Sequence, residues 1–173
     1  MALTIEDGTI VAAADSYQTL VTARADAANR GLTLNADDTI AEQQLRQAYY
    51  FLTNIYEPRM QGVRVSPDQT SMLPRTGMTA HGFSIASDAI PQVFLFAQNN
   101  IAASVEGGAD LSAIKTDADL ASFNVQGVYS ETYQSGSSTP TLPLMPAVSN
   151  FIKPYTITGL GTGLNREEMG YVG

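Results

Sequence analysis

Apolar residues recur at helical spacing in two stretches near the start of the chain. The first follows Asp15-Ser16-Tyr17, where Asp15 or Ser16 can cap a helix, and it closes at Arg30-Gly31. The second begins near Asp37-Asp38 and runs to about Glu57, where Pro58 stops it. Because only a short polar link separates the two stretches, we expect an antiparallel helical hairpin in which each helix covers the apolar stripe of the other.

The same spacing predicts the inner faces of the two helices. In the first helix the inner positions are Tyr17, Leu20, Val21, the stem of Arg24, Ala27 and Ala28. In the second helix they are Leu45, Ala48, Tyr49, Leu52, Ile55 and Tyr56. The aromatic group Tyr49, Tyr50, Phe51 and Tyr56 could instead stack on nucleic-acid bases, but no basic stripe accompanies it, so a core role is favoured.

The helical period disappears between Arg59 and Ser87. Glycine and proline punctuate this stretch, at Gly62, Pro67, Pro74, Gly77 and Gly82. The pattern predicts a long loop, and a loop of this length inside a compact domain usually has a function.

A third helix is expected after this loop. It should start at Ser87-Asp88-Ala89-Ile90-Pro91, with Pro91 in its first turn, and end at Gly107-Gly108. Leu95 and Phe96 widen its apolar face beyond one stripe. We therefore expect this helix to be buried on two sides, by the hairpin and by a neighbour or a sheet.

The pattern changes to alternation from about residue 120 to 134, which predicts a β-hairpin that turns around Gln126-Gly127. Residues 135–140 have the composition of a flexible linker, and a short helix can restart at Met145-Pro146 and reach Ile152. Residues 155–173 combine apolar side chains with five glycines and no periodic face. Such a tail is either disordered or ordered only against a partner.

These elements together predict a mainly α fold, a small bundle of three to four helices with a long loop, a β-hairpin and an extended C-terminal tail. We expect two parts along the chain. Residues 1–134 form the helical body with its hairpin, and residues 135–173 form the linker, the short helix and a docking tail.

The number and placement of charged residues indicate which kinds of partner the chain can bind. The chain has 17 acidic and 9 basic side chains and a formal net charge of −8. The basic residues are scattered singly, at positions 24, 30, 46, 59, 64, 75, 115, 153 and 166. Because affinity for nucleic acid comes largely from Lys and Arg, this is a poor phosphate-binding chain. An acidic surface suits a wall that DNA slides past, although it could equally serve only solubility.

No residue pattern indicates an enzyme, a metal site or a cofactor. There is no cysteine, and His81, the single histidine, stands in the glycine-rich loop without a second ligand at metal spacing. Asp117 and Asp119 fit a solvated turn as well as a metal site. The run Gly159-Leu160-Gly161-Thr162-Gly163 follows no convincing strand and opens no helix, so it does not predict a nucleotide site.

Nothing in the sequence predicts a membrane span or a secretory leader, because no stretch approaches roughly 20 apolar residues and the N-terminus lacks a basic segment before an apolar run. We therefore expect a soluble protein that starts in a cytoplasm.

Two segments resemble a protein family of tailed bacteriophages. They are Val65 to Gly77 followed by Ser87-Asp88-Ala89-Ile90-Pro91 and Ala97, and the opening Glu6-Asp7-Gly8-Thr9 with Ala14-Asp15-Ser16-Tyr17. Members are often labelled DnaT-like single-stranded-DNA-binding proteins, and they are similar to the head-to-tail connector, or adaptor, proteins of phages. The resemblance covers residues 3 to 105 well and the hairpin more loosely.

The two labels predict different proteins. The DNA-binding label predicts a basic face, whereas the adaptor label predicts a small helical body, a long loop and hairpin, and a terminus that reaches a portal subunit. Because the chain is acidic, we favour the adaptor. The alternatives are a DnaT-like single-stranded-DNA-binding accessory protein and a minor structural protein elsewhere in the particle.

The resemblance then implies a ring of identical subunits, twelvefold, in the neck of the virion and assembled in the host cytoplasm. Its partners would be the portal protein and tail or nozzle proteins, and DNA would pass through the lumen without specific binding. The expected contact residues are Pro67, Pro74 and Arg75 in the loop and Ile157, Leu160 and Leu164 in the tail. For Arg75 an alternative is that it covers helix ends of its own domain.

Overall fold

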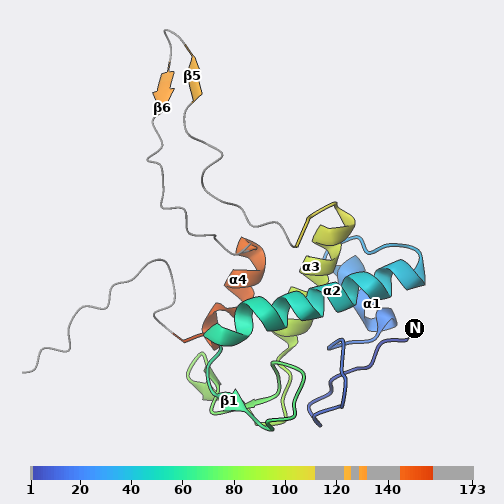
Figure 1. The fold of residues 1–173 in the computed structure, drawn as a ribbon, viewed down its shortest axis with the longest axis vertical. Coiled ribbons are helices and arrows are strands. Elements are labelled where there is room, and N and C mark those ends of the chain that lie inside the picture. The colour runs from blue at the N-terminus through green and yellow to red at the C-terminus, as the bar shows by residue number, and fades with distance from the viewer. Residues whose placement is uncertain (1, 112–122, 126–128, 132–144, 158–173) are drawn as a thin grey trace, which may run out of the picture.

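The computed structural model describes residues 2–111, 123–125, 129–131 and 145–157 (Figure 1). Its fold is mainly α, as predicted. The helices are α1 (Leu20–Asn29), α2 (Asp38–Tyr56), α3 (Gln92–Glu106) and α4 (Pro146–Ile152), with the short 3₁₀ helices η1 (Glu57–Arg59) and η3 (Lys153–Tyr155). The strands are β1 (Val63–Arg64), β2 (Arg75–Thr76), β3 (Thr79–Ala80), β4 (Phe83–Ser84), β5 (Phe123–Val125) and β6 (Tyr129–Glu131).

The second helix confirms its prediction closely. Asp37 is the N-cap of α2, and its carboxylate accepts a hydrogen bond from the backbone N–H of Ile40 at 3.1 Å. Its inner face contains Leu45, Tyr49 and Leu52, each at most 1% exposed. The helical period and the capping residues were therefore sufficient to locate this element.

The first helix starts later than predicted. Its N-cap is Thr19, so neither Asp15 nor Ser16 caps it, and Tyr17 enters the core from the segment before the helix. The buried residues of the helix are Ala23, which was not predicted, and Ala27, which was. Of the other predicted inner residues, Val21 is 80% exposed and Ala28 is also on the surface.

Helix α3 is the centre of the bundle, because it contacts α1, α2 and α4. Its side chains Phe94, Ala97, Ile101 and Ala102 are fully buried. Pro91 is its N-cap and has an extended backbone, so it lies just before the first turn rather than in it, and neither Ser87 nor Asp88 caps the helix. The predicted burial on two sides is confirmed, although α4 takes the place expected for a neighbour or a sheet.

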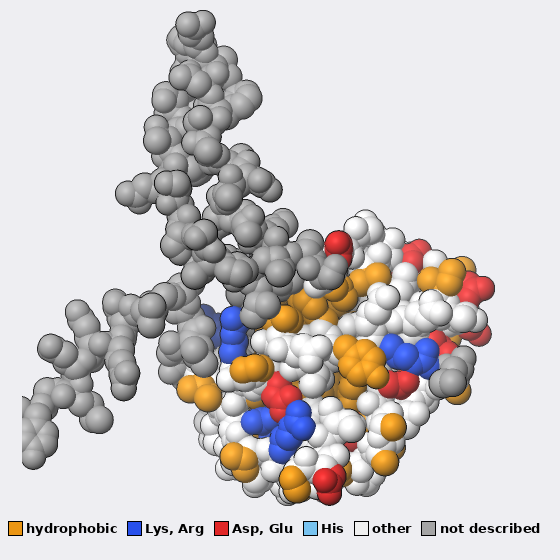
Figure 2. Space-filling view, viewed as in Figure 1, with side chains coloured by type: hydrophobic (Ala, Val, Ile, Leu, Met, Phe, Trp, Pro, Cys, Tyr) orange, Lys and Arg blue, Asp and Glu red, His pale blue; other side chains and the backbone are white. Residues whose placement is uncertain are grey.

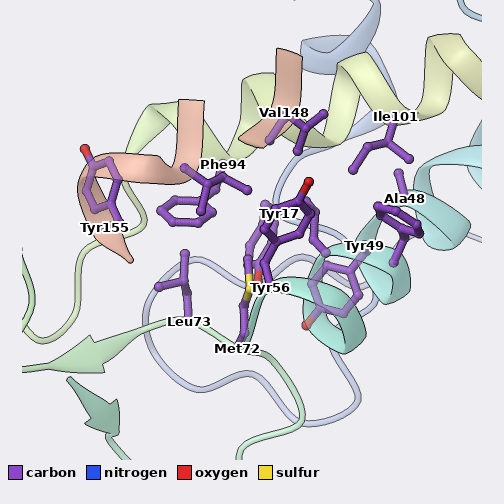
Figure 3. Packing of buried hydrophobic residues seen from close by; sticks show 14 of the residues in the cluster. Tyr17, Ala48, Tyr49, Tyr56, Met72, Leu73, Phe94, Ile101, Val148 and Tyr155 are labelled. Carbon is purple, nitrogen blue, oxygen red and sulfur yellow. The ribbon is translucent and has the colours of Figure 1, made fainter. Parts of the chain in front are cut away.

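Helix α4 packs into the same core as the first three helices (Figure 3). Val148 and Ile152 are at most 1% exposed, and the ring of Tyr155 meets that of Phe94 at 5.3 Å between centroids. The backbone continues this attachment, because Ile157 donates its N–H to the carbonyl of Arg59 at 2.8 Å. The described body therefore extends to residue 157, instead of ending at residue 134 as the domain prediction placed it.

The predicted long loop holds two short antiparallel ladders. Strand β1 pairs with β2, and β3 pairs with β4. His81 and Gly82 form the turn between β3 and β4 with positive φ angles of 52° and 85°, and the His81 side chain is exposed as expected. Met72, Leu73 and Met78 from this loop are at most 1% exposed and enter the core. The loop is thus an ordered part of the body.

The predicted C-terminal hairpin is confirmed in its two strands. β5 and β6 are antiparallel, with Val125 opposite Tyr129 and Phe123 opposite Glu131. The residues of its turn, Gln126 and Gly127, lie outside the described residues, as do the predicted linker at 135–140 and the tail from residue 158.

Candidate functional site

The residues that sequence reasoning assigned to contacts lie in different environments. Pro67 is exposed in the loop, but Pro74 and Arg75 are buried within the body. Ile157 is 51% exposed at the end of the described chain. Leu160 and Leu164 lie outside the described residues. Of the six, Pro67 and Ile157 are therefore the ones that the structure shows to be accessible.

Arg75 is bound by its own domain. Its Nε and Nη2 atoms donate hydrogen bonds to the backbone carbonyls of Gln61 and Gly62, each at 2.8 Å, and Nη1 lies 3.4 Å from the carboxylate of Glu57. Burial lowers the pKa of Arg75, and the nearby charge of Glu57 raises it in part. This geometry supports the alternative in which Arg75 bonds within its own domain, but its closest acceptors are loop carbonyls instead of the expected helix ends.

Glu57 joins two arginines at the end of α2. Both of its oxygens accept from Arg64, at 2.5 and 2.6 Å, in a bidentate pair. The remaining amino group of Arg64 reaches the carbonyl of Gln69, whose own amide donates to the carbonyls of Ser71 and Pro74. These side-chain to backbone bonds connect the segments of the loop with one another.

The residues that carry the family resemblance at the N-terminus also have structural roles. The buried carboxylate of Glu6 accepts hydrogen bonds from the backbone N–H groups of Gly8, Ile10 and Val11, at 2.9 to 3.1 Å. Gly8 has a φ of 102°, and a Cβ atom there would lie 1.8 Å from the carbonyl oxygen of Asp88. The signature thus specifies how the N-terminal segment packs on the body.

A buried polar network joins this segment to α3. The amide of Gln98 donates to Ser16 Oγ and to the carbonyl of Leu45, each at 2.9 Å, and its Oε1 accepts from the backbone N–H of Tyr17 at 3.2 Å. Gln18 and Asn99 extend the network with a 2.9 Å bond between their amides. Sequence reasoning missed these residues, although the polar run at 98–100 inside an apolar helix was a visible signal.

No metal-binding cluster is present in the described part of the chain. It contains no group of three or more His, Cys, Asp or Glu side chains that could hold a metal ion. Asp117, Asp119 and the glycine-rich run at 159–163 fall outside it.

None of the described helices is long and apolar enough to cross a membrane.

Most described cations are engaged in ion pairs, which bears on nucleic-acid binding. Seven Lys and Arg side chains fall within the described residues. Five of them pair with carboxylates of the same chain, namely Arg24, Arg30, Arg46, Arg64 and Arg75. Arg59 and Lys153 are the two for which the structure shows no such pair. A cation that already neutralises a carboxylate releases fewer counterions when it meets a phosphate.

The aromatic group on α2 belongs mostly to the core. Tyr49, Phe51 and Tyr56 are at most 6% exposed, whereas Tyr50 is 54% exposed. Tyr50 helps to line an open groove of about 490 Å³ between α2 and the residues that follow α3; the lining is Gln47, Tyr50, Phe51, Asn54, Ile55, Ala109, Asp110 and Leu111. Tyr50 is thus the one accessible ring of this group on α2, and one ring there is not a platform for successive bases.

Apolar side chains on the surface gather near the loop. We use the name loop end for residues 57–85 and 153–157, which lie together because the backbone of Gln61 bonds to that of Tyr155. Among the described residues seven large apolar side chains are exposed, and four of them belong to the loop end: Val63, Val65, Phe83 and Ile157. Figure 2 shows apolar and basic side chains side by side on this part of the surface. Such a mixture is typical of a surface that contacts protein.

A family model described as "Putative DnaT-like ssDNA binding protein" matches residues 1–168. No curated protein and no solved structure matches the chain. The match confirms the DnaT-like label of the sequence resemblance and covers more of the chain than the motifs did. The description of the family does not mention head-to-tail connectors.

Proposed function

The chain belongs to the family described as "Putative DnaT-like ssDNA binding protein", and from that premise we propose that it is a structural assembly protein, the adaptor between portal and tail of a tailed bacteriophage. The family description names single-stranded DNA and so supports the second candidate, a DNA-binding accessory protein, more directly than it supports the adaptor. The described surface is our reason for preferring the adaptor.

The proposal rests on one observation, namely that most of the described arginines already form ion pairs within the chain. Five described arginines are held in ion pairs inside the chain, in a protein whose formal net charge is −8. A nonspecific DNA binder needs free cations along a groove, with stacking aromatics beside them. This body instead offers exposed apolar side chains at its loop end, with Phe83 73% exposed. Protein is the partner that such a surface fits best.

In this proposal identical subunits repeat around a ring, and each uses one patch for one neighbour and a different patch for the other. The tail region would reach the portal or tail proteins, with Ile157 at its start, and DNA would pass the acidic lumen without specific contacts. Like charges on the wall and the DNA would limit adhesion.

The test is the location of the protein in the particle. Antibodies against the purified protein, coupled to gold, would be applied to virions of the phage that encodes the chain and viewed by negative-stain electron microscopy. The adaptor predicts label at the neck. Virions without label, together with antigen confined to infected-cell extracts, would contradict it and favour the DNA-binding accessory protein.

A further inference from the structure

The two ends of α2 carry opposite charge. The loop end has four basic residues, Arg59, Arg64, Arg75 and Lys153, against two acidic ones, Glu57 and Asp68, which gives +2. We use the name helix end for residues 19–42, which contain α1 and the start of α2. The helix end has four acidic residues, Asp26, Asp37, Asp38 and Glu42, against Arg24 and Arg30, which gives −2.

Glu106 increases the negative charge of the helix end, because the last turn of α3 reaches it. The carboxylate of Glu106 accepts hydrogen bonds from the side-chain amides of Asn35 and Gln44, at 3.0 and 2.7 Å. These neutral donors lower the pKa of Glu106, so the group is charged at neutral pH. Figure 2 shows acidic side chains near the end of the body where α2 begins.

Each end also exposes large apolar side chains. At the helix end these are Val21, 80% exposed, and Ile40, 43% exposed. Val21 lies one turn before Arg24 on α1, and Arg24 contacts Asp38 at the start of α2 at 2.6 Å. At the loop end Phe83 and Val63 are more than 60% exposed. Both surfaces therefore pair an apolar contact with charge.

The two surfaces are too far apart to meet within one copy. Helix α2 has 19 residues, which separates its ends by roughly 28 Å at 1.5 Å per residue. Self-pairing of either end across a two-fold axis would bring like charges together, whereas contact between unlike ends would bring opposite charges together. A contact between unlike ends is heterologous, and its repetition generates a ring or an open chain of subunits.

We propose that the loop end of one copy docks on the helix end of a second copy of this chain, with Phe83 and Val21 in the contact. This inference rests on the proposed adaptor function and names the two surfaces that would join neighbouring subunits. Apolar contact supplies affinity, while the opposite charges orient the two copies.

Two variants of the full chain test the pairing. Phe83→Asp damages only the loop end, and Val21→Asp damages only the helix end, because each places a carboxylate opposite an apolar partner. Both positions are exposed in the single chain, and an acidic residue in the first turn of α1 is compatible with the helix. Tyr50→Asp is the matched control, since Tyr50 is exposed on α2 between the two ends. Thermal melts would confirm that all three variants fold.

The readout is the mass of the species in sedimentation velocity, measured over a wide concentration range. We expect the wild type and the control to form species larger than one chain, and each end variant to remain a single chain. An equimolar mixture of the two end variants should form a species of two chains and nothing larger, because one intact helix end meets one intact loop end.

Three results would overturn the inference. They are a wild-type protein that stays a single chain, end variants that assemble like the wild type, and a mixture that does not form the pair of chains. Each leaves the adaptor function standing if gold label is found at the neck. Absence of that label would be failure of the proposed function itself, so the two failures can be told apart.

Discussion

Gln98 is fully buried in the middle of α3, yet its side chain has partners on two other segments. It bonds to Ser16 and Tyr17 of the N-terminal segment and to the backbone of Leu45 in α2. A buried amide of this kind costs stability unless its bonds are made, so its presence fixes one arrangement of the three segments.

Replacing this amide should be costly. We expect Gln98→Ala to lower the free energy of unfolding by about 2 kcal/mol or more, because it leaves the buried N–H of Tyr17 and the hydroxyl of Ser16 without that partner. Gln43→Ala, an exposed glutamine on α2, is the control and should change stability by less than about 0.5 kcal/mol. Urea unfolding measures both, and equal effects would show that the network is not stabilising.

The buried tyrosines should limit stability at high pH. Burial raises the pKa of Tyr49 to about 12 and raises that of Tyr17 further above its ordinary value. The folded state then holds these protons more tightly than the unfolded state, so this stability is complete below about pH 10 and is lost as pH rises through the folded pKa. The melting temperature should fall above about pH 10, and more gently in Tyr17→Phe. A flat profile to pH 12 would contradict this account.

The environments of some single side chains could be predicted from the sequence, and those of others could not. The exposure of His81 was predicted correctly. It is the single histidine and lies in a glycine-rich loop, where the sequence shows no second metal ligand or paired acid near it. The internal role of Arg75 was only one of two alternatives, because its acceptors are backbone carbonyls of Gln61 and Gly62 that no sequence pattern identifies. Such contacts depend on how the loop folds.

Among the elements, α2 and α3 were predictable because each carries an apolar period over four turns or more. Helix α1 was placed too early, since Tyr17 is apolar and buried but lies outside the helix. The ladders of β1 to β4 could not be predicted, because strands of two residues are too short to show alternation. The bounds of α4 were predicted, but its place in the core was not, because tertiary contacts decide it.

The place of α4 gives an element-scale prediction. Ile152 is fully buried in the core, where α4 packs on α3, so Ile152→Ala should lower the free energy of unfolding of the whole body by roughly 2–5 kcal/mol. Asn150→Ala, on the exposed side of the same helix, is the matched control. Differential scanning calorimetry should show one transition that moves. A separate small transition that moves alone would mean that α4 is an independent unit.

At the scale of the whole molecule, charge separates along the body, and large apolar side chains are exposed at both ends. The helix end is acidic, and the loop end is basic and rich in exposed apolar residues, with Phe83 as its most exposed ring. The total charge was evident from composition, but this distribution was not, because it depends on the fold that brings residues 153–157 beside residues 57–85. The structure therefore shows that charge is distributed unevenly along the body, whereas composition shows only that the net charge is negative.

Family membership and surface chemistry point to different partners at this scale. The family description names single-stranded DNA, while the paired arginines and exposed apolar side chains favour protein. Salt concentration distinguishes DNA from protein as the partner. DNA binding through cations weakens steeply as the salt concentration rises, whereas apolar contacts between proteins do not.

The most direct test of the central claim is the affinity of the purified full-length protein for a fluorescent oligothymidylate, measured by anisotropy at low and at physiological salt. The account predicts no saturation below roughly 10 µM at physiological salt, because few cations are free to displace counterions. Sub-micromolar binding that weakens steeply with added salt would contradict it and would make the protein a single-stranded-DNA binder.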